Sequence, residues 1–429
     1  MNNLSLLDVI EVIGGGTPKR NVADYWNGDI DWLSVKDLNA DGRYVHSAAE
    51  KITTLGLNRS STKMLAVGDL IISARGTVGC LAQLTKPMAF NQSCYGIRGK
   101  ENLDNDFLFY FLKTKITELQ KNSHGAVFDT ITTNTFKIIS INLPPLDEQK
   151  VIASVLGALD DKIENNRRMN ETLEEMARAI FKSWFVDFDP VHAKAAGNAP
   201  VHMDAETAAL FPSSFGDDGL PVGWEKKELG SLAQVLNGYA FKSSDYVKEG
   251  LFVLRTKNFG DARSAERLAD DVYLPEKFAE DYQKYLCEPF DFHVVMVAAS
   301  LGKTSYIFPH MLPALRNQNM WCFRPAKGFP YRFFLNLSIE DKITHVIGWG
   351  SGSARDFFKK ADFVKHQITI CENSILDQFE KTAASLFKKI AANHHQNETL
   401  AELRDTLLPK LMSGEIRVKD AKRTVEAVV

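Results

Sequence analysis

Asn170-Glu171-Thr172-Leu173 decides how this chain is organised, because the same four residues return as Asn397-Glu398-Thr399-Leu400, 227 positions further on. Asn91-Gln92 likewise returns as Asn317-Gln318 at nearly the same shift. A period this long indicates a duplicated domain-plus-helix unit, because solenoid repeats are much shorter. A duplicated chain is expected to fold about an internal pseudo-two-fold axis, as a homodimer does. Double-stranded DNA is the commonest ligand that shares this symmetry.

Each copy of the repeat contains a long run of apolar residues at heptad spacing, first over 149–185 and again after residue 373. Such sustained spacing predicts a coiled coil. Both runs carry asparagines in the middle of the seam, where a polar residue weakens packing but fixes register. We therefore predict that the two helices pair with each other as an antiparallel coiled coil. The alternative is that each helix pairs with a different protein. The predicted seam consists of Leu156, Ile163, Asn166, Asn170, Leu173, Ile390, Asn393, Asn397 and Leu400.

The fold class that this order predicts is α+β. Two duplicated mixed α/β domains, module 1 (1–145) and module 2 (223–372), are separated by two long helices in a pseudo-two-fold arrangement. The expected helices cover 146–186 and 373–416, with a linker at 187–222 and a tail at 417–429. Pro190 is expected to end the first helix.

Short β-branched or aromatic segments bounded by Gly or Asn predict the strands of each module. In module 1 the strands are expected at 30–35, 69–74, 78–84, 95–98 and 137–143, with a helix over 106–119 that Asp106 caps. In module 2 they are expected at 251–255, 292–299, 304–308, 320–324 and 364–370, with a helix near 331–343.

Composition limits the class of protein. The 429 residues suffice for about three domains, and 45% apolar with 24% charged residues is typical of a globular protein. A net charge of −3 argues against a uniformly basic surface, although basic residues can still gather on one face. The five cysteines are scattered, which favours reduced buried thiols. The first residues lack a secretory signal, and the run 294–301 is too short to span a bilayer, so we expect a cytoplasmic protein.

Glycine-bounded loops with cations recur in the two modules. Loop 14–20 is matched by 237–242, and loop 74–79 is matched by 299–304. Such loops suit close approach to a phosphate or a groove edge. For any single residue, a solvated turn with a surface cation is an equally good interpretation. The candidate DNA contacts are Thr17, Lys19, Arg20, Lys36, Arg75, Thr77, Lys242, Lys257, Lys303, Thr304, Ser353 and Arg355.

The two Asn-Gln pairs suit adenine chemically. We favour a structural role for them instead, in capping the strand that follows each pair.

No catalytic constellation emerges from the sequence. Gly302-Lys303-Thr304 resembles the end of a phosphate-binding loop, but Val297 stands where that motif needs glycine. The Asp/Asn-Pro-Pro-aromatic tetrad of adenine methyltransferases is missing, and Glu225-Lys226-Lys227 lacks the Pro-Asp that would make it a nuclease motif. His394-His395 has no second ligand pair, so no metal site is expected.

Four further motifs give the chain a family resemblance. The motifs are Leu143-Pro144-Pro145-Leu146-Asp147-Glu148-Gln149, Ser183-Trp184-Phe185-Val186-Asp187-Phe188-Asp189-Pro190-Val191, Leu220-Pro221-Val222-Gly223-Trp224 and Leu407-Leu408-Pro409-Lys410-Leu411-Met412-Ser413-Gly414-Glu415-Ile416. With these motifs the chain resembles the specificity subunit of a type I restriction–modification enzyme over nearly its whole length.

The resemblance implies a non-catalytic subunit with two target-recognition domains, each reading one half of a bipartite duplex DNA site. It implies that the helices dock two methyltransferase (modification) subunits and that restriction subunits join the full complex. No cofactor is expected on this chain, since S-adenosylmethionine, ATP and Mg belong to the partners. The chain departs from the family pattern at two points. Module 1 lacks the Pro-x-Gly-Trp start of module 2, and the second helix begins through Cys371-Glu372-Asn373-Ser374 without Pro-Pro or Glu-Gln.

Two rival functions remain at this stage. The first is an enzyme that fuses recognition with its own nuclease or methyltransferase, which S-adenosylmethionine binding by the isolated chain would support. The second is a scaffold whose modules bind protein, which the lack of a salt-dependent gel shift with duplex DNA would favour.

Overall fold

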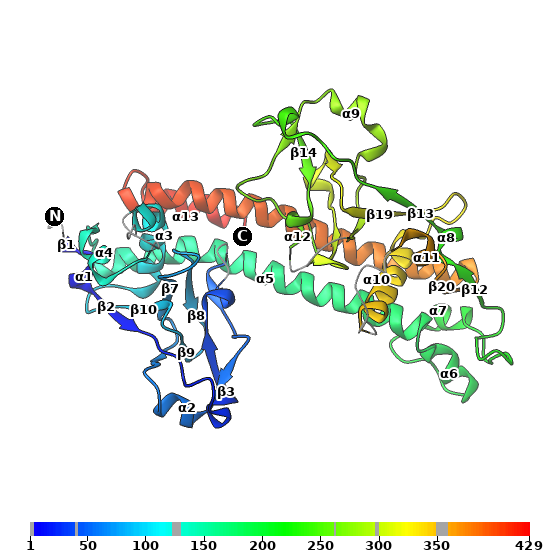
Figure 1. Cartoon of the computed structure of the whole chain (residues 1–429), viewed down its shortest axis with the longest axis horizontal. Coiled ribbons are helices and arrows are strands. Elements are labelled where there is room, and N and C mark those ends of the chain that lie inside the picture. The colour runs from blue at the N-terminus through cyan, green and yellow to red at the C-terminus, as the bar shows by residue number, and fades with distance from the viewer. Residues whose placement is uncertain (1–3, 39–41, 122–129, 261–262, 297–299, 349–358) are drawn as a thin grey trace. The chain divides into compact units, whose positions relative to one another are not determined.

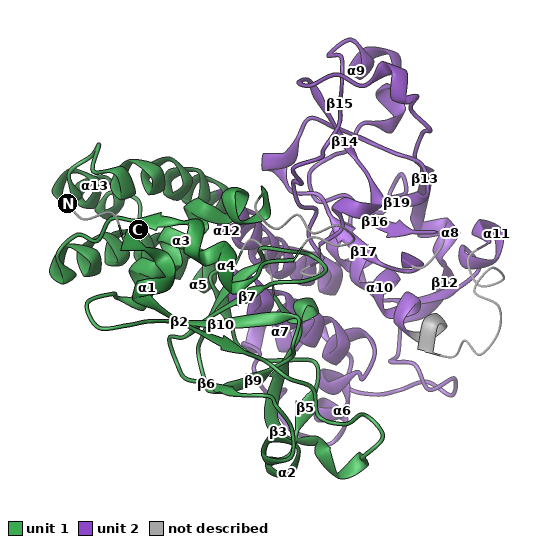
Figure 2. Ribbon diagram, turned by 60° about the vertical axis from the view of Figure 1, so that its left-hand side comes forward, with its two compact units in different colours: residues 1–166, 396–429 green, residues 167–395 purple. Residues whose placement is uncertain are grey.

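A computed structural model describes residues 4–38, 42–121, 130–260, 263–296, 300–348 and 359–429 (Figure 1). The chain forms two compact units (Figure 2). Unit 1 consists of residues 1–166 and 396–429, and unit 2 consists of residues 167–395. Each unit therefore contains one module together with part of each long helix. Among the described residues, no helix combines the length and apolar character needed to cross a bilayer.

Unit 1 contains two larger sheets and one two-stranded sheet. The larger sheet has the strand order β2 (Ile10–Gly14), β10 (Cys94–Gly99), β7 (Leu70–Ser73), β8 (Leu81–Leu84) and β4 (Tyr44–Val45). The smaller sheet has the order β5 (Lys51–Ile52), β3 (Trp26–Leu33), β9 (Met88–Phe90) and β6 (Met64–Leu65), and β1 (Leu4–Ser5) pairs with β11 (Ser140–Ile141). Its shorter helices are α1 (Leu6–Val9), α2 (Thr54–Asn58), α3 (Asn105–Lys121) and α4 (Thr133–Ile138).

The core of unit 1 explains why these segments fold as they do. All four residues of β7 are buried, as expected for a continuous apolar strand inside a sheet. Helix α3 contacts β8 and β10, and its residues Phe107 through Leu112 are all buried in the core of unit 1. Its N-cap is Asp104, whose carboxylate accepts a hydrogen bond of 3.0 Å from the Phe107 N–H. The prediction that Asp106 caps this helix is therefore wrong, and Asp106 instead pairs with Arg43.

Unit 2 repeats this architecture. One sheet has the order β13 (Ala233–Asn237), β19 (Met320–Pro325), β16 (Phe292–Val295) and β17 (Thr304–Tyr306). Another has the order β15 (Tyr273–Leu274), β14 (Leu251–Leu254) and β18 (Ala314–Arg316), and β12 (Glu225–Glu228) pairs with β20 (Gln367–Ile370). Its shorter helices are α6 (Asp189–Ala195), α7 (Ala205–Leu210), α8 (Leu229–Leu232), α9 (Phe278–Asp281), α10 (Arg332–Gly348) and α11 (Lys360–Phe363).

The duplication is thus visible in the strand pairing of the two units. The antiparallel order β2-β10-β7-β8 corresponds to β13-β19-β16-β17. In the second sheets, β3 pairs in parallel with β9 just as β14 pairs in parallel with β18. The α+β fold class and the duplicated modules are confirmed.

The two long helices, α5 (Leu146–Phe185) and α12 (Asn373–Ser413), pair with each other inside each unit. In unit 1, Asp160 contacts Arg404 and Asn166 contacts Asn397. In unit 2, Asn393 donates to Asn170, and the Trp184 ring lies 5.9 Å from the Phe379 ring. Residue numbers rise along one helix as they fall along the other, so the helices are antiparallel as predicted. Most seam residues are buried, namely Leu156, Ile163, Asn166, Asn170, Ile390, Asn393 and Leu400, whereas Leu173 and Asn397 are half-buried.

Several predicted boundaries were wrong. The stretch 137–143, predicted as a strand, begins inside α4 and contains only the two-residue strand β11. Pro190 does not end the first helix, because it lies in the first turn of α6, and the chain turns at Phe188 with a φ of 55°. The tail forms helix α13 (Val418–Glu426), which buries Ala421 and Val425 in the core of unit 1.

Candidate nucleic-acid interface

Polar loops of module 1 converge on Asn91, at the end where the parallel strands β3 and β9 both finish. The Asn91 N–H donates to the Leu33 carbonyl oxygen at 2.9 Å. A Cβ on Gly15 would lie 2.1 Å from the Asn91 carbonyl oxygen, so only glycine permits this approach. Thr17 donates to Gln92, and the Arg75 N–H donates to the Ser93 carbonyl oxygen at 3.2 Å. Loops that lie far apart in the sequence therefore form one surface.

Loop 60–63 joins the same surface, although its residues were not predicted. A Cβ on Gly16 would lie 2.4 Å from the Thr62 nitrogen, and the Thr62 hydroxyl donates to the Phe90 carbonyl oxygen at 2.7 Å. The signal that was overlooked is the polar and basic run Arg59-Ser60-Ser61-Thr62-Lys63. We define the recognition edge of module 1 as loops 15–19, 34–36, 60–63, 75–77 and 91–93.

Cationic side chains gather on this recognition edge. Lys19, Lys36, Lys63 and Arg75 are exposed there, and so is Thr77. Exposed cations on neighbouring loops suit the phosphates of a nucleic-acid backbone, whereas hydroxyl and amide side chains suit base edges. The edge has both kinds of group, and Thr17 and Gln92 supply the second kind.

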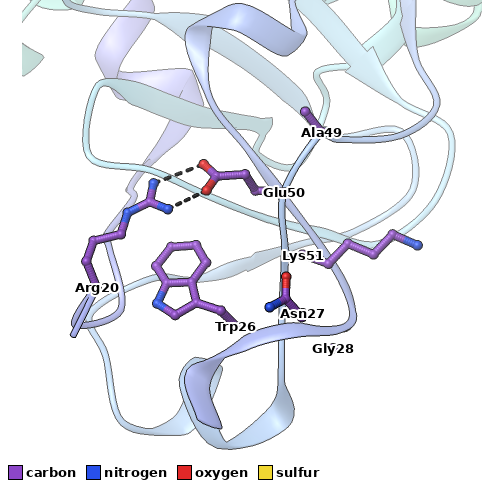
Figure 3. Close-up of a pocket in the computed structure, with 7 residues that line it drawn as sticks. All are labelled: Arg20, Trp26, Asn27, Gly28, Ala49, Glu50 and Lys51. Atoms are coloured by element: carbon purple, nitrogen blue, oxygen red, sulfur yellow. Dashed lines mark hydrogen bonds and ion pairs between the residues drawn. The ribbon is translucent and has the colours of Figure 1, made fainter. Parts of the chain in front are cut away.

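Arg20 differs from the other predicted contacts because it is held by a carboxylate (Figure 3). Its two terminal nitrogens donate to the two oxygens of Glu50, and its guanidinium carbon lies 3.9 Å from the centre of the Trp26 ring. The hydrogen bond from Arg20 lowers the pKa of Glu50 below its usual range. Arg20 and Trp26 line a hollow of about 440 Å³ together with Asn27, Gly28, Ala49, Glu50 and Lys51. The charge of Arg20 is thus balanced by a carboxylate of the same module, in an exposed ion pair.

Module 2 has a recognition edge of the same construction, around Asn317. The Asn317 N–H donates to the Leu254 carbonyl oxygen at 2.9 Å, which repeats the bond between Asn91 and Leu33. A Cβ on Gly238 would lie 1.6 Å from the Asn317 carbonyl oxygen. The Met296 N–H donates to the Asn319 carbonyl oxygen at 3.0 Å, as the Ala74 N–H donates to Ser93 in module 1. We define this edge as loops 238–242, 255–257 and 317–319.

The predicted cations of module 2 have different surroundings. Lys242 is exposed, whereas Lys257 forms an ion pair with Asp270. Lys303 is half-buried, and Thr304 is only 8% exposed inside β17, where it pairs with Val294. Burial removes Thr304 from the set of accessible contacts. Ser353 and Arg355 lie outside the described residues.

An aromatic cluster at the edge of module 2 was not predicted. Tyr239 lies where module 1 has Gly16, and its ring centre is 4.8 Å from that of Tyr282 and 5.0 Å from that of Tyr285. A hydrogen bond to Tyr239 raises the pKa of Tyr282. These tyrosines are half-buried and come from segments over 40 residues apart, so sequence spacing gave no signal. The two edges therefore share a backbone plan but present different side chains.

The asparagine of each Asn-Gln pair has the structural role that we favoured. The Asn91 side-chain oxygen accepts from the Ser93 N–H at 3.0 Å, and the Asn317 side-chain oxygen accepts from the Gln318 N–H at 2.8 Å. Each asparagine therefore caps the turn that precedes a strand.

One buried cluster in unit 2 has the donor types of a metal site. The ligand atoms of Cys287, Asp291 and His293 lie within 4.8 Å of one another. However, Arg324 donates to both oxygens of Asp291 at 2.9 and 2.7 Å, and Arg332 donates to one of them at 3.0 Å. Because the carboxylate is already neutralised by arginines, we assign no metal to this cluster.

The motifs at the start of α5 and the end of α12 meet in unit 1. They line a hollow of about 490 Å³ with Asp147, Glu148, Val151, Leu411, Gly414, Ile416, Arg417 and Val418. Gln149 is fully buried and serves the fold, because it accepts from the Asp104 N–H and donates to the Asn102 and Pro144 carbonyl oxygens. Asp147 and Glu148 are exposed, as are the apolar side chains of Leu146 and Val151. The exposed part of the motif is therefore available to a partner.

Comparison with known proteins gives consistent results. Residues 1–175 match the family model of the type I restriction modification DNA specificity domain. The chain is 28% identical to the MjaIX specificity subunit of Methanocaldococcus jannaschii, over 96% of this chain and 93% of that protein. It is also 28% identical to the HindI specificity subunit of Haemophilus influenzae, over 72% of this chain and 77% of that one. The fold matches the S subunit of M. genitalium with a TM-score of 0.51 at 15% identity, covering 96% of this chain and 95% of that one.

Proposed function

We propose that this chain, which belongs to the family of type I restriction–modification specificity subunits, reads a bipartite DNA target with one half-site at the recognition edge of each module. As a member of that family, the chain confers DNA sequence specificity and is non-catalytic. In this proposal 1–145 and 223–372 are the target-recognition domains, and the helices over 146–186 and 373–416 are the spacers.

The observation that carries the proposal is the repeated construction of the two edges. In both modules a glycine lies against an asparagine carbonyl, at residues 15 and 91 and again at 238 and 317. The same backbone therefore presents different side chains twice, namely Thr17 and Gln92 in module 1 and a tyrosine cluster in module 2. This arrangement is what a protein needs to read two different half-sites with one docking geometry.

Charge supports DNA as the ligand of these edges. The chain has a net charge of −3, yet exposed cations gather at the edge of module 1. A local cluster of this kind attracts the phosphate backbone even when the whole protein is slightly acidic. Lys19, Lys36, Lys63 and Arg75 are proposed to contact phosphates, and Thr17 and Gln92 are placed to reach bases.

We propose further that the hollow lined by Asp147, Glu148, Leu411 and Ile416 docks a modification subunit. Its support is that two motifs from distant parts of the chain meet there with exposed apolar side chains beside them. Two modification subunits would bring S-adenosylmethionine to adenines flipped out of the duplex. Restriction subunits, with ATP and Mg, would join the full complex. A chain that acts on cellular and incoming DNA is expected in the cytoplasm.

The experiment has two parts. Co-expression with the modification subunits, followed by methylation-sensitive sequencing, should reveal two short specific half-sites separated by a fixed gap. The affinity of the purified complex for that duplex should then fall steeply with salt. The expected decrease is roughly 10³–10⁵-fold between 50 and 200 mM salt if 6–10 phosphates are contacted. Methylation at a single continuous site would contradict the bipartite reading. Binding that is independent of salt would favour a protein-binding scaffold.

A further inference from the structure

Arg43 and Arg263 occupy the same place in the two modules. The Gln83 N–H donates to the Arg43 carbonyl oxygen at 2.7 Å, and the Tyr306 N–H donates to the Arg263 carbonyl oxygen at 2.8 Å. In each case the next residue forms a parallel bridge to the same partner strand, β8 in unit 1 and β17 in unit 2. The duplication has therefore kept an arginine at this position of both modules.

In unit 1, Arg43 begins a buried chain of polar contacts that ends on the long helices. Its guanidinium donates to Gln83 at 2.9 Å, to Asp106 at 2.7 Å and to the Tyr110 hydroxyl at 3.3 Å. That hydroxyl donates to Asp160 of α5 at 2.6 Å, and Arg404 of α12 donates to the other oxygen of Asp160 at 2.6 Å. The network therefore runs from the module through α5 to α12, and Arg43, Tyr110, Asp160 and Arg404 are all buried.

Gly157 shows how closely Arg43 fits against α5. A Cβ on Gly157 would lie 2.8 Å from a terminal nitrogen of Arg43, which accounts for a glycine inside a long helix where this residue is disfavoured. The contacts continue along the same face of α5. Tyr44 donates to Asp161 at 2.7 Å, and the His46 ring lies 3.0 Å from Glu164. Spacings of three and four residues place these positions on one helical stripe.

In unit 2 a similar polar network links the module to the helix pair, but it contains different carboxylates. Arg263 forms an ion pair with Glu340 of α10. Arg178 of α5 donates to Glu340 at 3.0 Å and to Glu174 at 2.7 Å. Under the repeat, Arg404 of α12 corresponds to a residue of α5 that directly precedes Arg178. In both units, an arginine of the module and an arginine of the helix pair are thus linked through buried carboxylates.

We infer that Arg43 and Arg263 are positioning residues, which hold each module at one orientation on the helix pair and so fix the gap between the two half-sites. This inference rests on the proposed function. Apolar packing alone is non-directional and tolerates small rotations, whereas a buried charge-assisted network is satisfied in one arrangement only. Only a small displacement of a module is compatible with a fixed gap, because a shift of roughly 3.4 Å at the recognition edge corresponds to one base pair of DNA.

The chain offers a matched control for Arg43. Arg98 donates to Asp69 at 2.8 Å, and its repeat counterpart Arg324 donates to Asp291 at 2.9 Å. These pairs also join an arginine to a buried carboxylate, but Arg98 bonds within its own sheet, to Asp69 and Glu11. Arg98→Met should therefore lower stability without altering the orientation of module 1.

The experiment uses the full chain with its modification subunits and a DNA library in which the gap between the half-sites varies. Arg43→Met and Arg263→Met should leave the half-site bases unchanged. Methylation of sites whose gap is one base pair shorter or longer should rise at least tenfold relative to the original chain. Arg98→Met should reduce methylation of all sites equally. Tyr110→Phe removes only the hydroxyl that joins Arg43 to Asp160, so it provides the same test if Arg43→Met does not assemble.

The inference is overturned if the assembled variants methylate only the original gap, as Arg98→Met does. A change in the half-site bases would also overturn it, because Arg43 would then act on sequence readout. Failure of the proposed function is distinguishable, since the unmutated complex would show no bipartite methylation.

Discussion

The side chain of Asn166 donates a hydrogen bond of 2.8 Å to the side chain of Asn397 across the paired helices of unit 1. The duplication maps this pair onto Asn393 and Asn170 in unit 2, where Asn393 donates to Asn170, also at 2.8 Å. Donor corresponds to donor and acceptor to acceptor. Polar residues that weaken a seam have therefore been kept in both copies, which is expected if they set the register of the helices.

The Asn166–Asn397 pair can be measured with a double-mutant cycle. Asn166→Leu alone should lower the free energy of unfolding by about 1–3 kcal/mol, because Asn397 loses its donor within a largely buried seam. The double variant with Asn397→Leu should recover most of that loss, since the seam is then apolar on both sides. Chemical denaturation of the four proteins gives the coupling energy. Additive effects within about 0.5 kcal/mol would contradict a direct bond.

Arg75 tests the recognition edge of module 1. Arg75→Glu should weaken DNA binding by about 1–3 kcal/mol and reduce the salt dependence, because an exposed cation is replaced by an anion beside the phosphates. The matched control is Lys100→Glu, since Lys100 follows the far end of β10 and bonds to the Asp8 carbonyl oxygen. Titration of the duplex target by fluorescence anisotropy compares the two. Equal losses of DNA affinity in the two variants would show that only the net charge of the protein matters.

Gly14 and Gly15 are neighbours with opposite expectations. A Cβ on Gly15 would meet the Asn91 carbonyl oxygen at 2.1 Å, whereas a Cβ on Gly14 would meet nothing within 4 Å. Gly15→Ala should therefore cost about 1–3 kcal/mol of stability and weaken DNA binding, because the edge must open. Gly14→Ala should be neutral, or stabilising by about 0.4–1 kcal/mol. Thermal melts and DNA titration check both variants. A Gly15→Ala variant with unchanged stability and DNA affinity would contradict the close approach of Gly15 to the Asn91 carbonyl oxygen.

The histidines of unit 2 predict a pH dependence. Burial lowers the pKa of His394 and of His310 to about 4 in each case, and the rings stack 6.2 Å apart, with Arg167 near the first and His395 and Arg267 near the second. The folded pKa lies below the unfolded value of about 6.5. Stability from these neutral rings is thus complete above pH 6.5 and declines as the pH falls from 6.5 toward 4. Denaturation at pH 7 and pH 5 should show the loss, and His394→Phe should reduce it.

The long-range periodicities were the predictable part of this fold. The heptad pattern and its asparagines depend only on spacing within a helix, so the pairing of α5 with α12 followed from the sequence. Competition between two local structures explains why a strand was wrongly predicted at 137–143. Ile138 and Ile139 are β-branched and favour a strand, but Thr132 and Thr135 form a reciprocal cap that begins α4, and this helix extends through Ile138.

For the candidate site, only the positions of the loops could be predicted from the sequence. Glycine-rich segments pointed to the loops that meet at Asn91 and Asn317, because glycine allows the close backbone approach found there. That these loops contact DNA stays a prediction. The partners of the cations depended on tertiary contacts. Arg20 meets Glu50, thirty positions away, and Tyr239 meets Tyr282, more than forty positions away. No local pattern indicates which charges the protein neutralises itself.

The composition of unit 1 has a consequence for synthesis on the ribosome. Unit 2 is one continuous stretch, 167–395, so all of it is translated before residues 396–429. Unit 1 needs residues 396–429 as well, and α13 seals its core with Ala421 and Val425. Module 1 therefore emerges long before the segment that completes its core, and the apolar face of α5 in unit 1 stays uncovered until residues 396–429 have been made. Chaperones that shield nascent chains have a long task at this face, and α13 completes a unit that module 1 began.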